Sequence, residues 1–202
     1  MLPTALSFAF ASLIIELTPG PNMTYLALVA ASDGRRAGFA TVAGVALGLA
    51  TLGLAAAFGV AQLISASPIA YETLRWAGVL FLLYLAWDGW RGEGDVVAVA
   101  SNSDGRYFRR GLITNLLNPK AAVFYVAVLP TFIDAARPML AQTVTFTLVY
   151  VAVATLVHAA IVILAGALEP VLNDPRRERA ARRALSILLA MVAVWFGWST
   201  AR

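Results

Sequence analysis

The stretch ELTPGPN, residues 16–22, interrupts an apolar run that extends over residues 2–31. A run of this length predicts a membrane-spanning helix, because an α-helix crosses the hydrocarbon core in about 20 residues. Pro19 and Pro21 lack a backbone N–H and their rings clash with the preceding helical turn, while Gly20 between them accepts backbone angles that other residues avoid. The sequence therefore predicts a helix that is broken inside the membrane.

Glu16 and Asn22 flank this break. Hydrocarbon cannot hydrogen-bond the backbone groups that a broken helix leaves free, so such a break must face protein or a water-filled cavity. Ionisable residues inside membrane spans are rare and usually line transport pathways. A proline kink that serves only packing would not require a carboxylate and an amide beside it. We therefore interpret the break as part of a functional site.

The composition indicates an integral membrane protein. Of the 202 residues, 60% are hydrophobic and only 13% are charged, and the mean hydropathy is +0.78. Average soluble domains are less apolar and carry about 25% charged residues. The chain has no cysteine, which excludes disulfides, thiol relays and cysteine metal sites. The N-terminus lacks the basic region and cleavage site of a signal peptide, so the first span is expected to remain in the protein.

Six apolar segments predict six membrane-spanning helices in an all-α membrane protein. The long polar segment 92–110 is expected to be a connecting loop that divides the single membrane domain, 1–202, into two halves of three spans, 1–91 and 111–202. The six predicted spans are residues 3–31, 38–64, 74–90, 111–133, 140–168 and 184–199.

The basic residues predict the orientation of these spans. The net charge of +4 could suggest a nucleic-acid partner, but the arginines lie in short loops between apolar segments, where the positive-inside rule explains them better. The opposite loops and the C-terminus hold only Arg75, Arg137 and Arg202. Both termini are therefore expected outside the cell. The predicted cytoplasmic arginines follow spans one, three and five: Arg35, Arg36, Arg91, Arg106, Arg109, Arg110, Arg176, Arg177, Arg179, Arg182 and Arg183.

The two halves carry matching features. Pro21-Asn22 in the first span corresponds to Pro119-Lys120 in the fourth, and the third and sixth spans end in WDGW (87–90) and WFGW (195–198). Three spans per half force the halves into opposite orientations. This is the inverted-repeat plan of many secondary transporters, whose interrupted helices meet near the bilayer midplane. We expect two inverted three-helix repeats, each with a proline-broken first helix.

Such breaks suit a zwitterionic solute. The N-terminus of a half-helix offers free N–H groups and a partial positive charge to a carboxylate. The C-terminus of a half-helix, together with a carboxylate side chain, suits an ammonium group or a proton. An amino acid carries both charges. The candidate substrate-binding residues are Glu16, Pro19, Gly20, Pro21, Asn22, Asn115, Asn118, Pro119 and Lys120.

Two of the ionisable residues leave alternatives open. Lys120, the only lysine, either pairs with Glu16, which would neutralise two costly charges, or extends to the cytoplasmic interface. His158 is either a packed, hydrogen-bonded residue or a proton carrier, because the charge of histidine changes near physiological pH. Glu16 and His158 are the candidates for proton coupling.

The chain resembles the lysine-exporter (LysE/RhtB) family of bacterial amino-acid efflux proteins over nearly its whole length. This resemblance implies a multi-pass protein of the cytoplasmic (inner) membrane that exports an amino acid or a close derivative, driven by the proton-motive force. It does not fix the substrate. The residues that carry it are TPGPN (18–22), Gly38, Gly44 and Gly48, RRG (109–111), TNLLNPK (114–120), Phe124 and Pro130.

Other function classes fit less well. A cation exporter would need several converging oxygen ligands, more than Glu16 alone. An intramembrane enzyme would need a nucleophile–base pair or metal ligands such as HExxH, and the chain has one histidine and no cysteine. An assembly subunit would not need matched helix breaks. No P-loop is present, so ATP-driven transport is not expected. The expected partners are the amino-acid substrate and the bilayer, with no cofactor and no nucleic acid, and homo-oligomer formation is left open.

Overall fold

The computed structural model describes residues 2–17, 20–59, 67–91, 103–134, 136–167 and 175–199. Within these ranges every regular element is a helix, as the composition predicts. The elements are α1 (Leu2–Leu17), α2 (Pro21–Ser32), α3 (Gly34–Ala57), α5 (Pro68–Arg91), α6 (Ser103–Leu116), α7 (Pro119–Val123), the π-helix η1 (Phe124–Val128), the 3-10 helix η2 (Leu129–Phe132), α8 (Met139–Gly166) and α9 (Pro175–Ser199).

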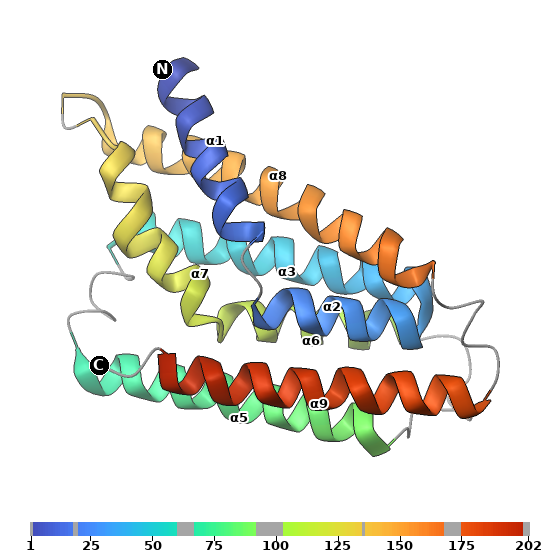
Figure 1. The fold of residues 1–202 in the computed structure, drawn as a ribbon. Coiled ribbons are helices and arrows are strands. Elements are labelled where there is room, and N and C mark those ends of the chain that lie inside the picture. The colour runs from blue at the N-terminus through green and yellow to red at the C-terminus, as the bar shows by residue number, and fades with distance from the viewer. Residues whose placement is uncertain are drawn as a thin grey trace.

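The first predicted span is two helices, α1 and α2, that point in different directions (Figure 1). Gly20 precedes α2 in an extended conformation, with φ −161° and ψ 177°, and Pro21 begins the helix. Proline is well tolerated there, because the first helical N–H has no intrahelical acceptor. Pro19 lies outside the described residues. The predicted break in the first span is confirmed.

A second break separates α6 from α7. The axes on either side of it differ by 52°. Asn118 precedes α7 in an extended conformation, and its side-chain oxygen accepts a hydrogen bond from the backbone N–H of Lys120 at 3.0 Å. This is the usual cap of a helix N-terminus. The break predicted at Pro119 is therefore also present, and η1 and η2 continue the chain beyond it.

Two helices, α3 and α8, are long and apolar enough to cross a membrane by themselves, and the bent pair across the second break would make a third span. The remaining boundaries differ from the prediction where charges are dense. α6 begins at Ser103, inside the predicted loop 92–110, and α9 begins at Pro175, not at 184. Charged residues lowered the apolar signal in both places, but a helix continues through them.

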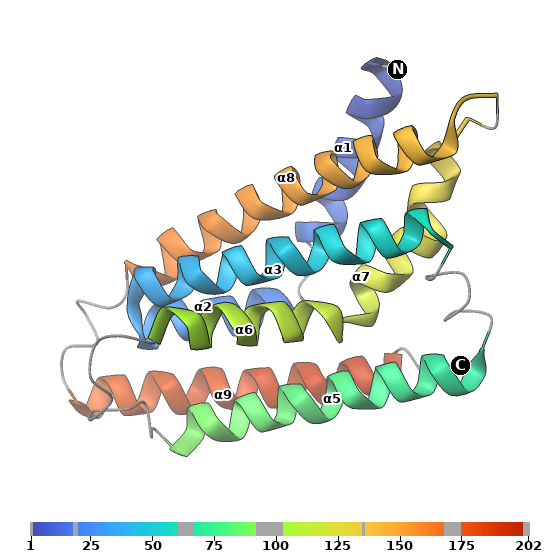
Figure 2. The same cartoon turned by 180° about the vertical axis from the view of Figure 1, so that it is seen from behind.

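The helices form layers in which corresponding elements of the two halves lie side by side (Figures 1 and 2). α3 packs against α8, and α5 packs against α9. The colours show that the members of each pair run antiparallel. α2 and α6 lie between these two layers, and α1 and α7 lie at one end of the molecule.

Glycines bring α3 and α6 into close contact. A Cβ atom at Gly44 would collide with the carbonyl oxygen of Phe108, and a Cβ atom at Gly111 would collide with the carbonyl oxygen of Thr41. Small residues at such positions allow the backbones of membrane helices to approach closely. The interface fixes α6, and with it the second break, against the first half of the chain.

Candidate functional site

The two helix breaks meet at one cavity. Its lining comes from the end of α1, the start of α2, the start of α7 and from α8, and it has room for about one water molecule. No cluster of three metal-ligating side chains occurs in the described part of the chain. The lining residues are Glu16 at the end of α1, Gly20, Asn22 and Met23 at the start of α2, Asn118, Lys120 and Ala121 at the second break, and Tyr150 on α8.

Two residues of α8 hold the carboxylate of Glu16, whose exposed fraction is only 5%. The hydroxyl of Tyr150 donates a hydrogen bond to Oε1 at 2.7 Å. Nε2 of His158 lies 3.2 Å from Oε2. Tyr150 and His158 are separated by about two helical turns, and the fully buried Ala154 between them leaves room for the carboxylate. One oxygen of the buried carboxylate thus accepts a hydrogen bond, and the other lies beside the imidazole.

His158 is itself buried, with an exposed fraction of 1%. Nε2 has no well-directed hydrogen bond in the described part of the chain, and its contact with Glu16 is the 3.2 Å approach to Oε2. The structure thus places His158 beside Glu16, and both interpretations, a packed residue and a proton carrier, stay predictions.

Lys120 reaches from the second break to the first. Its Nζ donates a hydrogen bond to the carbonyl oxygen of Ile15 at 2.7 Å. Within an unbroken helix that carbonyl would accept from the N–H four residues later, but Pro19 has none. Lys120 therefore caps the C-terminal end of α1. It lines the same cavity as Glu16, and this position disfavours the alternative in which it extends to the membrane interface.

The asparagines occupy different surroundings. Asn118 caps α7, whereas Oδ1 of the buried Asn22 has no hydrogen-bond partner in the part of the chain that the structure describes. Asn115 is fully buried in the interface of α3 and α6, and its Oδ1 lies 2.8 Å from the position that a Cβ atom on Gly48 would take. Asn115 is absent from the described lining of the cavity.

The structure describes only part of the predicted proline positions. Pro21 is buried at the start of α2 but does not line the cavity. Pro19 and the side chain of Pro119 lie outside what the structure describes. The contribution of the prolines to the site therefore comes from the backbone groups that they leave without helical partners, and not from side-chain contacts.

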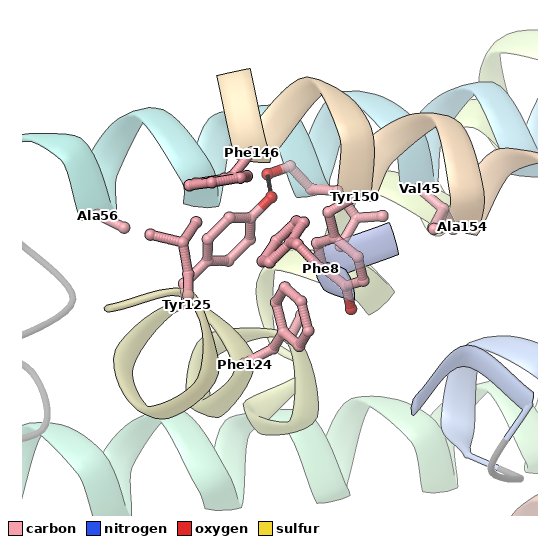
Figure 3. Packing of buried hydrophobic residues seen from close by; sticks show 11 residues of the cluster. Phe8, Val45, Ala56, Phe124, Tyr125, Phe146, Tyr150 and Ala154 are labelled. Atoms are coloured by element: carbon pink, nitrogen blue, oxygen red, sulfur yellow. Dashed lines mark hydrogen bonds between the residues drawn. The ribbon is translucent and has the colours of Figure 1, made fainter. Parts of the chain in front are cut away.

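Aromatic side chains pack around Tyr150 (Figure 3). The ring of Phe124 stacks on that of Tyr150 with centroids 3.9 Å apart, and Tyr125 packs edge-on at 5.6 Å. The hydroxyl of Tyr125 donates to the carbonyl oxygen of Leu49 at 2.8 Å. Because η1 carries Phe124 and Tyr125, the second break also positions the tyrosine that holds Glu16.

Sequence reasoning did not place Tyr150 among the candidate site residues, because a tyrosine in a membrane span can line a cavity but does not specifically indicate one. The available signal was the spacing of Tyr150 and His158, about two helical turns apart on a largely apolar helix, with the small Ala154 between them. Met23 and Ala121 also line the cavity, and nothing in their residue types indicated it.

Comparisons with known proteins relate the chain to a family of translocators. Residues 13–200 match the family model described as LysE type translocator. A homoserine/homoserine lactone efflux protein of Salmonella typhi is 30% identical over 189 residues, which cover 92% of each chain. The protein of the same name from Salmonella typhimurium is 29% identical over 189 residues, again 92% of each chain. No solved structure matches the chain.

Proposed function

The chain belongs to the LysE type translocator family, and from this premise we propose that it exports homoserine and homoserine lactone through the cavity between its two helix breaks. Export of an amino acid or an amino-acid derivative follows from the family and from the efflux proteins that the chain resembles. The observation that carries the more specific proposal is the convergence of Glu16 and Lys120 on one cavity.

The lining suits a small amino acid with an uncharged side chain. The carboxylate of Glu16 and the carbonyl at the end of α1 attract the substrate's ammonium group. The ammonium of Lys120 and the N-terminus of α2 attract its carboxylate. Among the described lining residues no other side chain is charged, so a charged substrate side chain would find no counter-ion. Oδ1 of Asn22 remains available to the hydroxyl of homoserine.

The cavity is narrow in the structure. Space for about one water molecule is far too small for an amino acid, so the substrate enters only after the surrounding helix ends move apart. The breaks are suitable hinges, because interrupted helices in secondary transporters let one part of the protein move against another around a fixed site.

Proton binding at Glu16 would couple export to the proton-motive force. A proton held by the Glu16–His158 pair and the ammonium of the substrate cannot both use the same carboxylate. Binding of a proton from outside would therefore release the substrate, and loss of that proton to the cytoplasm would make Glu16 ready for the next one. This competition gives exchange of substrate for protons, and a single deep carboxylate is sufficient for it.

The topology that this mechanism requires is six spans in the cytoplasmic membrane, with the halves inverted. The antiparallel pairing of α3 with α8 and of α5 with α9 supports it. Cysteines introduced at Ser103 and Ser67 test it, because the natural chain has no thiol background. We expect an impermeant thiol reagent to label Ser67→Cys from outside and Ser103→Cys only from the cytoplasm. Labelling of both from one side would overturn the inverted arrangement.

Efflux from preloaded bacteria tests the substrate. Cells with and without the protein take up a dipeptide that contains homoserine, hydrolyse it, and release homoserine into fresh medium. We expect faster release with the protein, and collapse of that difference when an uncoupler dissipates the proton gradient. Equal release with and without the protein would reject homoserine, and parallel assays with dipeptides of other amino acids would then identify the substrate.

A further inference from the structure

We propose that Lys120 determines specificity: it admits substrates that carry a carbonyl oxygen next to the amino-bearing carbon and rejects simple amines. This inference rests on the proposed function, because it concerns how the same cavity selects its substrate. The observation behind it is the hydrogen bond from Nζ of Lys120 to the carbonyl oxygen of Ile15, at 2.7 Å across the two breaks.

Lys120 occupies the place that a substrate ammonium would take. The end of α1 offers a cation both the Glu16 carboxylate and a carbonyl that has no helical donor, since Pro19 lacks an N–H. The lysine ammonium already binds that carbonyl in the substrate-free structure. An incoming ammonium group must therefore displace the ammonium of the protein itself.

The displaced lysine then needs a new acceptor. An ammonium group has three donors, and leaving them unpaired in a half-buried position is costly. Two acceptors of the described lining are in use: Oδ1 of Asn118 binds the backbone N–H of Lys120, and the hydroxyl of Tyr150 is bound to Glu16. Oδ1 of Asn22 has no partner in the described structure, and in the proposed binding mode the substrate hydroxyl takes it. The acceptor that is left for Lys120 is then an oxygen beside the substrate's amino group.

Homoserine and its lactone both bring such an oxygen. The carboxylate of homoserine offers two charged acceptors beside the amino-bearing carbon, and the lactone offers one ester carbonyl at the same position. In 3-aminopropan-1-ol, which is homoserine without its carboxylate, the amino and hydroxyl groups remain but this oxygen is missing. The expected order of binding is homoserine, then the lactone, then 3-aminopropan-1-ol.

Ligand-dependent thermal stabilisation of the purified full chain in detergent tests this order without requiring transport. For each compound one measures the concentration that gives half of the maximal rise in unfolding temperature. For the natural protein we expect the half-maximal concentration of homoserine to be at least about tenfold lower than that of 3-aminopropan-1-ol. A factor of this size is the effect of one hydrogen bond to a charged group.

Lys120→Met removes the ammonium and keeps the length of the side chain. In this variant we expect homoserine to bind about tenfold more weakly and 3-aminopropan-1-ol to bind more tightly, because nothing has to be displaced. Lys120→Arg keeps a cation and should keep the natural preference if Lys120→Met fails to fold. Arg137→Met, which removes an exposed positive charge outside the cavity, is the matched control and should leave the order unchanged.

The outcomes separate this inference from the proposed function. If the natural protein binds homoserine but Lys120→Met leaves the ratio of the two concentrations unchanged, Lys120 is not the discriminating residue and the proposed function stands. If homoserine and 3-aminopropan-1-ol act on the natural protein at the same half-maximal concentration, the inference is also overturned. If the natural protein is stabilised by none of the three compounds, the proposed substrate and this inference fail together.

Discussion

The two helix breaks follow one plan but carry opposite charges. At the first break, Glu16 lies just before the interruption, and α2 begins without a side-chain cap. At the second break, Lys120 lies just after the interruption, and the side chain of Asn118 caps α7. The first break thus brings an anion to the cavity and the second brings a cation.

Each charge lies at the helix end that does not favour it. A carboxylate is disfavoured at a helix C-terminus and an ammonium group at a helix N-terminus, yet Glu16 ends α1 and Lys120 begins α7. The compensation comes from elsewhere in the fold: Lys120 caps α1, and α8 holds Glu16 through Tyr150 and His158. Neither charge is compensated by its own break, because each depends on partners from elsewhere in the fold. Such dependence is expected of a binding site, whereas two packing kinks would not require it.

The largest expected effect comes from removing the anion of the first break. Glu16→Gln keeps the size of the side chain and removes its charge, so substrate binding should weaken by about 10- to 100-fold and gradient-driven efflux should stop. The measurement is uphill homoserine efflux from proteoliposomes, with expression and folding verified alongside. Glu72→Gln on α5 is the matched control. Normal pumping by Glu16→Gln would mean that the carboxylate has only a packing role.

Restoring the helices at the breaks should be the next largest effect. Pro21→Leu and Pro119→Leu each supply an N–H that can close a helical hydrogen bond and satisfy carbonyls that the substrate would otherwise contact. Efflux should be lost in each variant while membrane insertion stays normal, as measured by transport in cells and by immunoblotting of membranes. If either variant exports at the natural rate, that proline is merely a packing kink and the symmetry between the breaks is only apparent.

Substitutions of the two residues that hold Glu16, Tyr150 and His158, should have different effects. Tyr150→Phe removes one hydrogen bond to a charged group and should weaken homoserine binding by about tenfold at every pH. His158→Gln keeps a hydrogen-bonding side chain but cannot titrate, so the dependence of efflux on pH between about 5 and 8 should flatten. Efflux measured over this pH range distinguishes them. The same pH profile in His158→Gln as in the natural protein would exclude a proton role for His158.

The smallest effects are expected from substitutions of the asparagines at the two breaks, Asn22 and Asn118, and these effects should differ. Asn118→Ala removes the cap of α7 and should lower the free energy of unfolding by about 1 kcal/mol. Asn22→Ala should leave stability nearly unchanged, because Oδ1 of Asn22 has no partner in the described structure, but it should weaken homoserine binding. Thermal unfolding with and without homoserine measures both. Equal destabilisation by the two changes would contradict the different roles assigned to these side chains.

The local chemistry of the breaks was predictable from the sequence, because prolines and glycine act on their own backbone. Pro21 and Pro119 predicted both interruptions, and the position of Glu16 and Lys120 beside them predicted a charged site. The partners from α8 were not predictable, since Tyr150 and His158 meet Glu16 through packing between segments far apart in the chain. The surroundings of Asn115 were not predictable either: substrate contact stays a prediction for it, and the structure places it beside Gly48 in the contact of α3 with α6.

The central claim is that both breaks line one substrate site, and substrate protection of engineered thiols tests it most directly. Met23→Cys places a thiol at the first break and Ala121→Cys at the second, both on the cavity, in a chain without other cysteines. Arg137→Cys, an exposed position, is the control. Homoserine should slow the reaction of a small thiol reagent at both cavity positions, with the same half-maximal concentration, and should not affect the control. Protection at only one break, or at neither in variants that still export homoserine, would contradict the shared site.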